Sequence, residues 1–537
     1  MTEEITTNRL ATDFLHAAKI GTATAIVGAG VSMLGNTKLP SGSQLRDAVI
    51  QAILGKQLLK KYWPYLSVRG SRFDSVVPEL LFEKIHSIVG QRLVAFFQLL
   101  RLATPNRGHH VLANIATSDG LLLLTTNFDL LLETAGCPPN RIQHLHGAID
   151  APDTMKFRLN LVGRGLRGQK QRVGAVALKG RSLFVFGYSF NDEDIRQLVK
   201  GSPPVSLYWH LKNKQDWALR NISLLKSVKT PIFLSFGDLH AVFDSLAGNV
   251  APWSIHTSAN PFKLPRQNLI AEASRNIVNH EREAILAVCL TEAHCGDGLK
   301  ALKKRIFDRP RCRLDVETYL ALTIGFRTLR MASECLSCCQ RALALLSEAD
   351  GCVFARAWNL LGLYYLERKV PDIAQAIVHF LRAKDILVRI GTKDANSEQT
   401  EILLSLVLNN LGLIELENTN NTEAVRYFKE SLRIKRRLGM LEGISQTAVN
   451  LCLAYQKNGR SKRVAYWRRI ADDLIEKYDL LFQRAYLNRE LGASLVAKGN
   501  KRRGRQRLLA ALNDYEVLES SQGIKLTRAA LKQAGAT

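Results

Sequence analysis

The sequence lacks the two features that would place a protein in or across a membrane. No stretch reaches the roughly 18 apolar residues that a membrane-spanning helix needs. The start of the chain, MTEEITTNRL, is polar and acidic, and no basic segment leads there into an apolar run, as it does in a secretory signal. These absences predict a cytoplasmic protein without a membrane partner.

Cysteine is also scarce, with nine residues among 537 and no spacing typical of a disulfide framework. Reduced, buried thiols explain these cysteines best. Cys335 and Cys338 have the C-x-x-C spacing of a metal site, but no second pair and no histidine lies near them in the sequence. We therefore expect core packing at this pair and no bound metal.

Acidic residues are too few to balance the basic ones. The net charge is +26, and half of the excess lies in residues 423–537, which contain 24 Lys and Arg against 11 Asp and Glu. Such a surface attracts acidic partners and can contact nucleic acid nonspecifically. Since no nucleic-acid-binding motif accompanies the charge, a solvated basic face is the simpler interpretation.

The first half of the chain alternates apolar, β-rich runs with segments of helical periodicity. This alternation predicts an α/β fold with a Rossmann-like, doubly wound parallel sheet, in which the polar ends of the strands meet at the carboxyl edge. We expect strands within 22–30, 120–129, 182–192, 206–211 and 230–236, and helices over 43–54, behind Ser41 or Ser43 as N-cap, and 78–101.

After about Pro261 the strand signals end and helix pairs continue almost to the C-terminus. Similar segments recur around Gly325, Gly362, Gly412, Cys452 and Gly492, at intervals of 37, 50, 40 and 40 residues. The pattern resembles tetratricopeptide repeats with a longer period, and it predicts stacked helix pairs that offer a surface to a protein partner. We therefore divide the chain into residues 1–262, a helical connector at 263–310 and repeats at 311–537.

Three short strings carry the chemistry of the first half. GAGVS at 28–32 follows an expected strand, and its glycines allow close approach to a diphosphate, although GAG alone is a weak signal. In TTNFD, at 125–129, Asn127 and Asp129 face the same side of an extended segment. In LHG, at 145–147, His146 follows a strand and can accept a proton near neutral pH. His109, His110 and His144 are interpreted as structural or bystander residues.

Together, in this order and spacing, the strings resemble the NAD site of the sirtuin (Sir2) family. A fourth string, FGYSFNDEDI from Phe186, resembles the bacterial Sir2-like domains found in antiphage defence proteins. The resemblance covers residues 10–260 and implies that Asn127, Asp129 and His146 are catalytic. It implies further that the NAD-binding residues are Gly28, Ala29, Gly30, Ser32, Thr126, Gly187 and Ser189.

One departure from that family bears on the reaction. Protein-deacylating sirtuins carry a four-cysteine zinc module after the LHG string, whereas Ala148–Arg181 contains no cysteine and is basic and glycine-rich. The resemblance therefore favours cleavage of NAD⁺ to nicotinamide and ADP-ribose over deacylation. Asp192 is expected to cap the following helix.

With a repeat array beside it, such a domain resembles abortive-infection NADases, which are switched on by a phage protein or another partner and which form homo-oligomers. Three alternatives remain: an NAD-dependent deacylase or ADP-ribosyltransferase, a non-catalytic sensor of NAD or ADP-ribose, and a basic nucleic-acid scaffold, which rests on charge alone.

Overall fold

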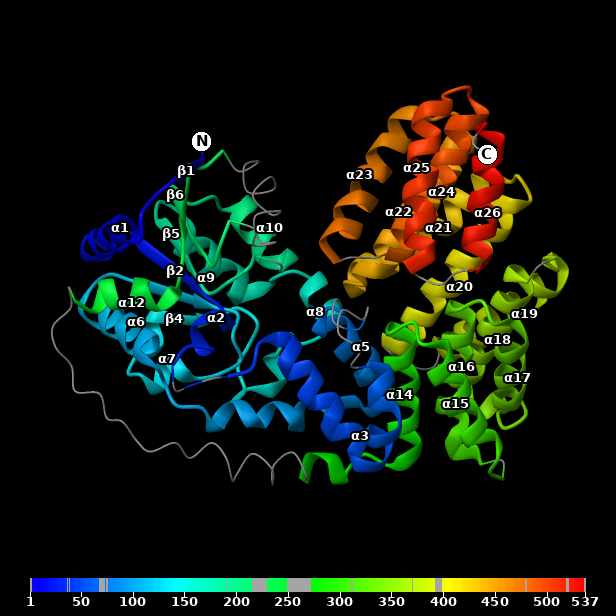
Figure 1. Ribbon diagram of the computed structural model, residues 1–537, viewed down its shortest axis with the longest axis horizontal. Helices are drawn as coiled ribbons and strands as arrows, with labels where there is room; N and C mark the ends of the chain where they lie inside the picture. Colours follow the sequence, from blue (N-terminus) through cyan, green and yellow to red (C-terminus); the bar gives the residue numbers. More distant parts are fainter. Residues whose placement is uncertain are drawn as a thin grey trace. The chain divides into compact units, whose positions relative to one another are not determined.

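The computed structural model describes residues 2–35, 37, 39–66, 73, 76–190, 192–214, 229–248, 272–310, 312–368, 370–391, 398–478, 481–517 and 521–535. The chain forms two compact units, shown in Figure 1. Unit 1 comprises Met1–Ile53 and Val89–Asn276, and unit 2 comprises Leu54–Ile88 and Ile277–Thr537. The expected boundary at residue 262 lies outside the described residues. No helix in these ranges is long and apolar enough to cross a membrane.

Unit 1 is built on a seven-stranded sheet in which every neighbouring pair is parallel, in the order β1-β7-β6-β5-β2-β3-β4. The chain lays down β2, β3 and β4 in one direction, then returns to the other side of β2 for β5, β6 and β7. The strand order therefore reverses between β2 and β5. The strands are β1 (Thr2–Glu4), β2 (Ala23–Val27), β3 (Leu122–Thr125), β4 (Ile142–His144), β5 (Ser182–Phe186), β6 (Ser206–Leu211) and β7 (Ile232–Phe236).

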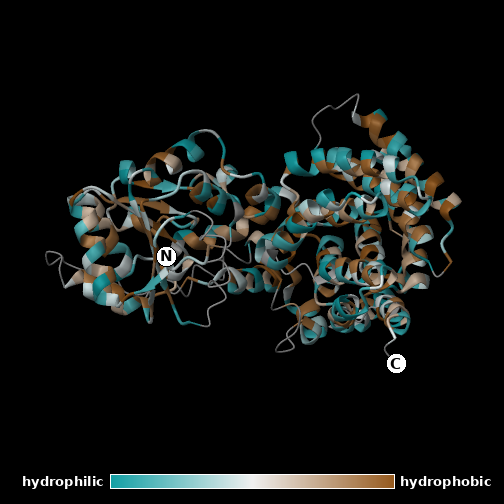
Figure 2. Ribbon diagram, turned by 90° about the horizontal axis from the view of Figure 1, so that it is seen from above, coloured by the Kyte–Doolittle hydropathy of each residue, from teal (hydrophilic) through white to brown (hydrophobic). Residues whose placement is uncertain are grey.

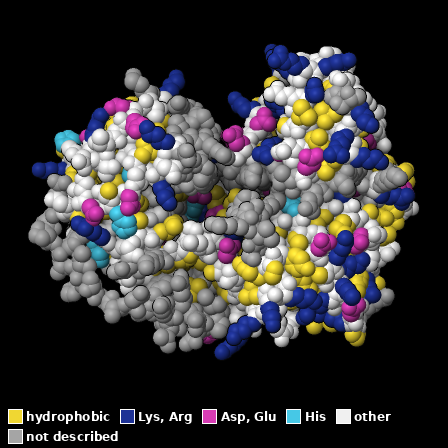
Figure 3. Space-filling model, in the orientation of Figure 1, with side chains coloured by type: hydrophobic (Ala, Val, Ile, Leu, Met, Phe, Trp, Pro, Cys, Tyr) yellow, Lys and Arg dark blue, Asp and Glu magenta, His cyan; other side chains and the backbone are white. Residues whose placement is uncertain are grey.

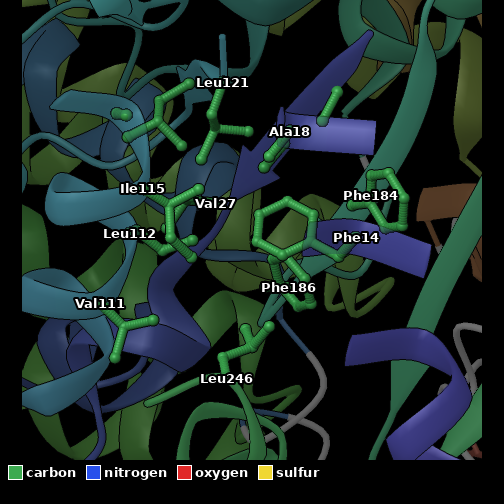
Figure 4. Packing of buried hydrophobic residues seen from close by; sticks show 14 of the residues in the cluster. Phe14, Ala18, Val27, Val111, Leu112, Ile115, Leu121, Phe184, Phe186 and Leu246 are labelled. Atoms are coloured by element: carbon green, nitrogen blue, oxygen red, sulfur yellow. The ribbon is translucent and has the colours of Figure 1, made fainter. Parts of the chain in front are cut away.

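The strands of unit 1 alternate their side chains between two buried faces. Val27 and Phe186 pack with Phe14 in one core, whereas Ile26 and Val185 belong to a second core. Figure 4 shows the first of these cores. One face is covered by α1 (Thr7–Lys19), α6 (Arg107–Ser118) and α12 (Leu239–Ala247), and the other by α9 (Gly168–Leu178) and α10 (Glu193–Gly201). This alternation explains why the strands read as continuous apolar runs.

The sequence located most of the strands but not every helix boundary. The helix behind Ser41 is present as α3 (Gly42–Leu66), and the Ser41 hydroxyl accepts the Gln44 amide at 3.3 Å. The single helix expected at 78–101 is instead two elements, α5 (Pro78–Val89) and the 3₁₀ helix η1 (Gly90–Leu102). They are separated by Gly90, whose φ of 61° ends the α-helix. Strand β1 was not expected, because its three residues are polar and exposed.

Unit 2 is helical, and brown and teal residues alternate along its amphipathic helices in Figure 2. Beyond α5, its helices are α14 (Asn279–Glu292), α15 (Gly296–Phe307), α16 (Val316–Thr328), α17 (Ala332–Leu343), α18 (Gly351–Glu367), α19 (Ile373–Gly391), α20 (Glu398–Glu417), α21 (Asn421–Leu438), α22 (Leu441–Lys457), α23 (Ser461–Tyr478), α24 (Leu481–Ala497), α25 (Lys501–Val517) and α26 (Ser521–Gln533). Helices α14 and α15 occupy the expected connector.

At several of the recurring small residues, the absence of a larger side chain lets the paired helix approach closely. A Cβ added at Gly362 in α18 would lie 2.6 Å from the ring of Phe380 in α19, and one at Gly412 in α20 would lie 2.6 Å from Phe428 in α21. Cys452 in α22 instead contacts the Val464 carbonyl of α23 at 3.7 Å. The helix-pair repeat predicted from these positions is therefore confirmed. Ala465, which the sequence pattern aligned with the buried Ala424, is exposed.

Cys335 and Cys338 lie in α17 and are buried, as expected for core thiols. Burial raises the pKa of each to about 12. Among the described residues, no group of three metal-ligating side chains lies close enough to hold an ion.

Candidate functional site

The four strings meet at the carboxyl edge of the sheet, where the strand order reverses. GAGVS follows β2, TTNFD follows β3, LHG follows β4 and FGYS follows β5. Backbone hydrogen bonds join them in pairs: the Gly30 amide donates to the Gly187 carbonyl at 2.9 Å, and the Leu145 amide donates to the Thr125 carbonyl at 2.8 Å. Gly30 and Gly187, which are 157 positions apart in sequence, are thereby neighbours.

The Ser32 hydroxyl connects the first two strings. It donates to Asp129 Oδ2 at 3.0 Å, accepts from Asn127 Nδ2 at 3.0 Å and lies 3.2 Å from His109 Nε2. A hydroxyl has one donor and two acceptor positions, so these three contacts saturate it. We call Ser32, His109, Asn127 and Asp129 the Ser32 cluster.

His109 is a neutral hydrogen-bond donor in this cluster. Its Nδ1 accepts the Asn106 amide at 3.2 Å, so the proton is on Nε2, which donates to Ser32. Burial, with a smaller contribution from His110, lowers the pKa of His109 to about 3. Ser32, His109 and Asp129 therefore do not form a nucleophile–base triad, because His109 cannot take the serine proton.

Asp129 is buried and is held by two donors, Ser32 and the Leu131 amide. Burial raises its pKa, and these hydrogen bonds oppose the shift. Asn127 is half-buried, and its backbone amide donates to Thr125 Oγ1 at 3.1 Å. Its carbonyl is 2.9 Å from Nδ1 of His144. His144, set aside as a bystander from the sequence, thus supports the backbone of Asn127.

His144 also lies 2.6 Å from Glu133 Oε1 through its other ring nitrogen. Burial alone would lower the pKa of His144, but the hydrogen bond and charge of Glu133 outweigh it, and the pKa is raised. The ring of His144 thus lies between the Asn127 carbonyl and Glu133, which fixes the turn that presents Asn127.

His146 faces a different set of residues. Its Nε2 lies 3.0 Å from Oδ1 of Asp194, a fully buried carboxylate in α10, and Lys156 Nζ donates to the other oxygen at 2.8 Å. Burial would lower the pKa of His146, but the charges of Asp194 and then Asp192 outweigh it and raise that pKa. Burial would raise the pKa of Asp194, yet His146 and Lys156 hold it at about 2.

The glycines of the first string have a packing role that the sequence did not reveal. A Cβ at Gly28 would lie 2.5 Å from the Gly187 carbonyl oxygen, and a Cβ at Gly30 would lie 2.7 Å from Gly187 Cα. Gly187 itself has a φ of 60°. These glycines thus let two loops touch, and α2 (Ala29–Ser32) behind them is a single turn.

The remaining expected NAD-binding residues line the same edge. Ala29 is exposed, whereas Thr126 and Ser189 are half-buried. The loop after β5 is held by its aromatic residues: Phe190 has a positive φ of 58° and packs edge-on against Trp209. Such a conformation is costly for a bulky residue and persists only where the surroundings enforce it.

Asp192 stands at the N-cap of α10, but its carboxylate accepts the Tyr188 hydroxyl at 2.6 Å. The Ile195 amide of this helix is bound by Asp194 instead. Sequence reasoning missed Asp194 and Lys156. The only signal was the acidic DED run of residues 192–194, which does not say which carboxylate meets a histidine 48 residues away.

No protein-family model matches the chain, and no curated protein matches it. Among solved structures it is similar to a Rap protein complexed with Competence and Sporulation Factor (11% identity, TM-score 0.34, 55% of this chain and 84% of that chain). It is also similar to aspartyl phosphate phosphatase F from Bacillus subtilis (10%, 0.34, 71% and 94%). A third is a STAND protein with a tetratricopeptide repeat sensor from Pyrococcus horikoshii (11%, 0.31, 98% and 85%). Scores this low assign neither a family nor a function.

Proposed function

We propose that unit 1 is a Sir2-like, Rossmann-type domain that hydrolyses NAD⁺ to nicotinamide and ADP-ribose. The observation that carries this proposal is the convergence of the TTNFD and LHG strings beside GAGVS, with Ser32 joining Asn127 to Asp129. The strand order from β4 to β7 supports it, because dinucleotide-binding sheets have this order and bind their ligand where it reverses.

In the proposed reaction the bond between nicotinamide and the ribose breaks and water adds to the ribose carbon. Asn127 orients the water and the ribose hydroxyls, since an amide both donates and accepts without adding charge. Asp129 holds the carboxamide. His146 takes the proton of the water through Nδ1, because its Nε2 is directed at Asp194.

The hydrogen bonds of the Ser32 cluster favour low basal activity. The groups assigned to the substrate bind one another: Asn127 Nδ2 donates to Ser32 and both oxygens of Asp129 are engaged. We propose that a protein partner bound by the repeats releases them. Resemblance to defence proteins supports a phage protein as that partner, an abortive-infection role and a homo-oligomeric active form.

The test is NAD⁺ consumption by the full-length wild type, Asn127→Ala and His146→Ala, with the exposed His240→Ala as control. We expect wild type and His240→Ala to release nicotinamide and the two site variants to lose about 10²-fold or more of that rate. Equal rates in all four proteins would contradict the assignment.

A second function, non-catalytic sensing of NAD or ADP-ribose, is favoured by the same saturated cluster. This function predicts that the wild type binds NAD⁺, as measured by calorimetry, without releasing nicotinamide. Asn127→Ala should lose that binding. Removal of acetyl groups from an acetyl-lysine peptide would instead point to a deacylase.

A further inference from the structure

The chain that follows the LHG string folds back onto His146. The Lys156 amide donates to the His146 carbonyl at 2.7 Å, so the two backbones are joined. Gly147 has a φ of 83°, and a Cβ there would lie 2.2 Å from the Thr154 carbonyl oxygen. The backbone therefore fixes where Lys156 stands relative to His146.

The Lys156 side chain bridges two other segments of unit 1. Only 14% of it is exposed, and its Nζ donates to Asp194 Oδ2 at 2.8 Å and to the Gly165 carbonyl at 2.9 Å. An ammonium group has three donor positions, and two of them are used by a carboxylate in α10 and by the turn after α8 (Leu159–Gly163). Lys156 thus ties the segment that follows His146 to the carboxylate that His146 faces.

Asp194 is held at both of its oxygens. Oδ1 lies 3.0 Å from His146 Nε2 and accepts the Ile195 amide at 2.9 Å, while Oδ2 accepts from Lys156. Because this carboxylate has a pKa of about 2, it is ionised and only accepts, so a neutral His146 carries its proton on Nε2. Nδ1 then has the lone pair that can accept a proton from water.

Lys156 also balances the charge of this buried group. A histidine facing a buried carboxylate alone would hold its proton, because the neutral ring would leave the negative charge without a cation. With Lys156 on the second oxygen, the carboxylate is already paired. Burial and Lys156 lower the pKa of His146, and Asp194 and Asp192 of α10 raise it. The remaining charge is Lys170 of α9, which faces Lys156 and Asp194.

We propose that Lys156 is a positioning residue for the proposed reaction. It holds Asp194 so that the carboxylate binds His146 through Nε2, and it neutralises that carboxylate so that His146 can act as a base in its neutral form. All three side chains belong to unit 1. This role rests on the proposed function for the reaction itself, whereas the effect of Lys156 on the protonation of His146 does not.

The experiment removes the charge of Lys156 in the full-length protein. Lys156→Gln keeps an amide donor without the charge, and Lys156→Met removes both, so a second neutral variant remains if one of them does not fold. Lys156→Arg restores a charged donor. The exposed Lys200→Met is the matched control, because it loses the same charge from the helix that carries Asp194.

The protonation of His146 is measured without NAD⁺ by an NMR titration of isotope-labelled histidine, with the signal assigned by its loss in His146→Gln. The pH profile of nicotinamide release measures the proposed activity. In Lys156→Gln and Lys156→Met we expect the His146 midpoint and the rising limb of kcat/KM to move up by about one pH unit, because a neighbouring positive charge is lost. Lys156→Arg and Lys200→Met should titrate as the wild type does.

An unmoved His146 midpoint in both neutral variants would overturn the role of Lys156. A lower rate with an unmoved pH profile would also overturn it, because a merely structural contact has that effect. A moved midpoint without nicotinamide release by any of the proteins would uphold the effect of Lys156 on His146 and overturn the proposed hydrolase function.

Discussion

Single residues decide the chemistry available at the carboxyl edge of the sheet. Ser32 uses its donor and both acceptor positions on His109, Asn127 and Asp129. The carboxylate of Asp194 is shared by His146 and Lys156. None of these pairings follows from spacing, because the partners lie between 38 and 97 positions apart. The histidine that the sequence marked as a base thus has a partner that the sequence did not mark.

Replacing Asp194 by Asn tests this pairing. A base must be neutral to accept a proton, so kcat/KM rises with pH through the pKa of His146, which Asp194 raises above its ordinary value. In Asp194→Asn the charge of Asp194 is lost and that pKa falls. We expect the rising limb of the pH profile to move to lower pH. The loss in kcat should be smaller than the loss of about 10²–10⁴-fold that follows when a general base is removed. The exposed Asp153→Asn is the control, and an unmoved limb would refute the pairing.

At the scale of elements, helix pairs depend on small residues facing large ones. Gly412 faces the ring of Phe428, and Gly362 faces that of Phe380 in the preceding pair. In the pair of α22 and α23 the corresponding residue is Cys452, whose thiol contacts the Val464 carbonyl of α23 at 3.7 Å.

Gly412→Ala should therefore destabilise unit 2 despite the higher helix propensity of alanine. Overpacking against Phe428 costs about 1–3 kcal/mol, whereas Gly→Ala gains about 1 kcal/mol in an open helix. Gly391→Ala, at the end of α19 with nothing within 4 Å of its Cβ, is the control that should be neutral or stabilising. Urea unfolding of both variants measures the difference, and equal midpoints would contradict it.

Lys435 in α21 makes a second element-scale prediction. It is fully buried, its Nζ donates to Thr447 Oγ1 at 2.8 Å, and the amides of Asn409 and Asn450 continue this polar network across α20 and α22. Burial lowers its pKa to about 7. Since the unfolded chain holds this proton up to about pH 10.4, stability should rise between pH 7 and pH 10 by at most about 1.4 kcal/mol per unit.

Lys435→Met should abolish that rise and stabilise the protein at pH 7, because an apolar side chain replaces a buried cation. The exposed Lys429→Met, on the same helix, should retain the slope. Unfolding midpoints measured from pH 6.5 to 10 distinguish them. A wild-type midpoint independent of pH would show that Lys435 is not buried as a titrating group.

At the scale of the whole molecule, charge is distributed unevenly. Lys501, Arg502 and Arg503 begin α25 and are exposed, and Figure 3 shows dark blue side chains over the helices of this part of the chain. Cations at a helix N-terminus oppose the helix dipole, so these residues do not serve the stability of α25. Their placement favours an acidic partner.

We expect the protein to bind heparin, used as a polyanionic probe, with an affinity that falls steeply with salt. Reversing Lys501, Arg502 and Arg503 to Glu should lower the salt concentration that elutes the protein from a heparin column. Reversing the exposed Lys19, Lys56 and Lys60 changes the net charge equally and is the control. The same elution for both triple variants would show that net charge, rather than this surface, governs binding.

The sequence by itself determined the parallel sheet, the helix-pair repeats and the strings that meet at one edge. These features follow from hydrophobic periodicity and from residues next to each other along the chain, because local interactions between such residues determine them. Only the tertiary structure decided that Ser32 joins Asn127 to Asp129, that Asp194 faces His146 and that residues 90–102 form a 3₁₀ helix. Each depends on which distant side chains share a buried volume, and there packing and the need to satisfy buried polar groups override local preference.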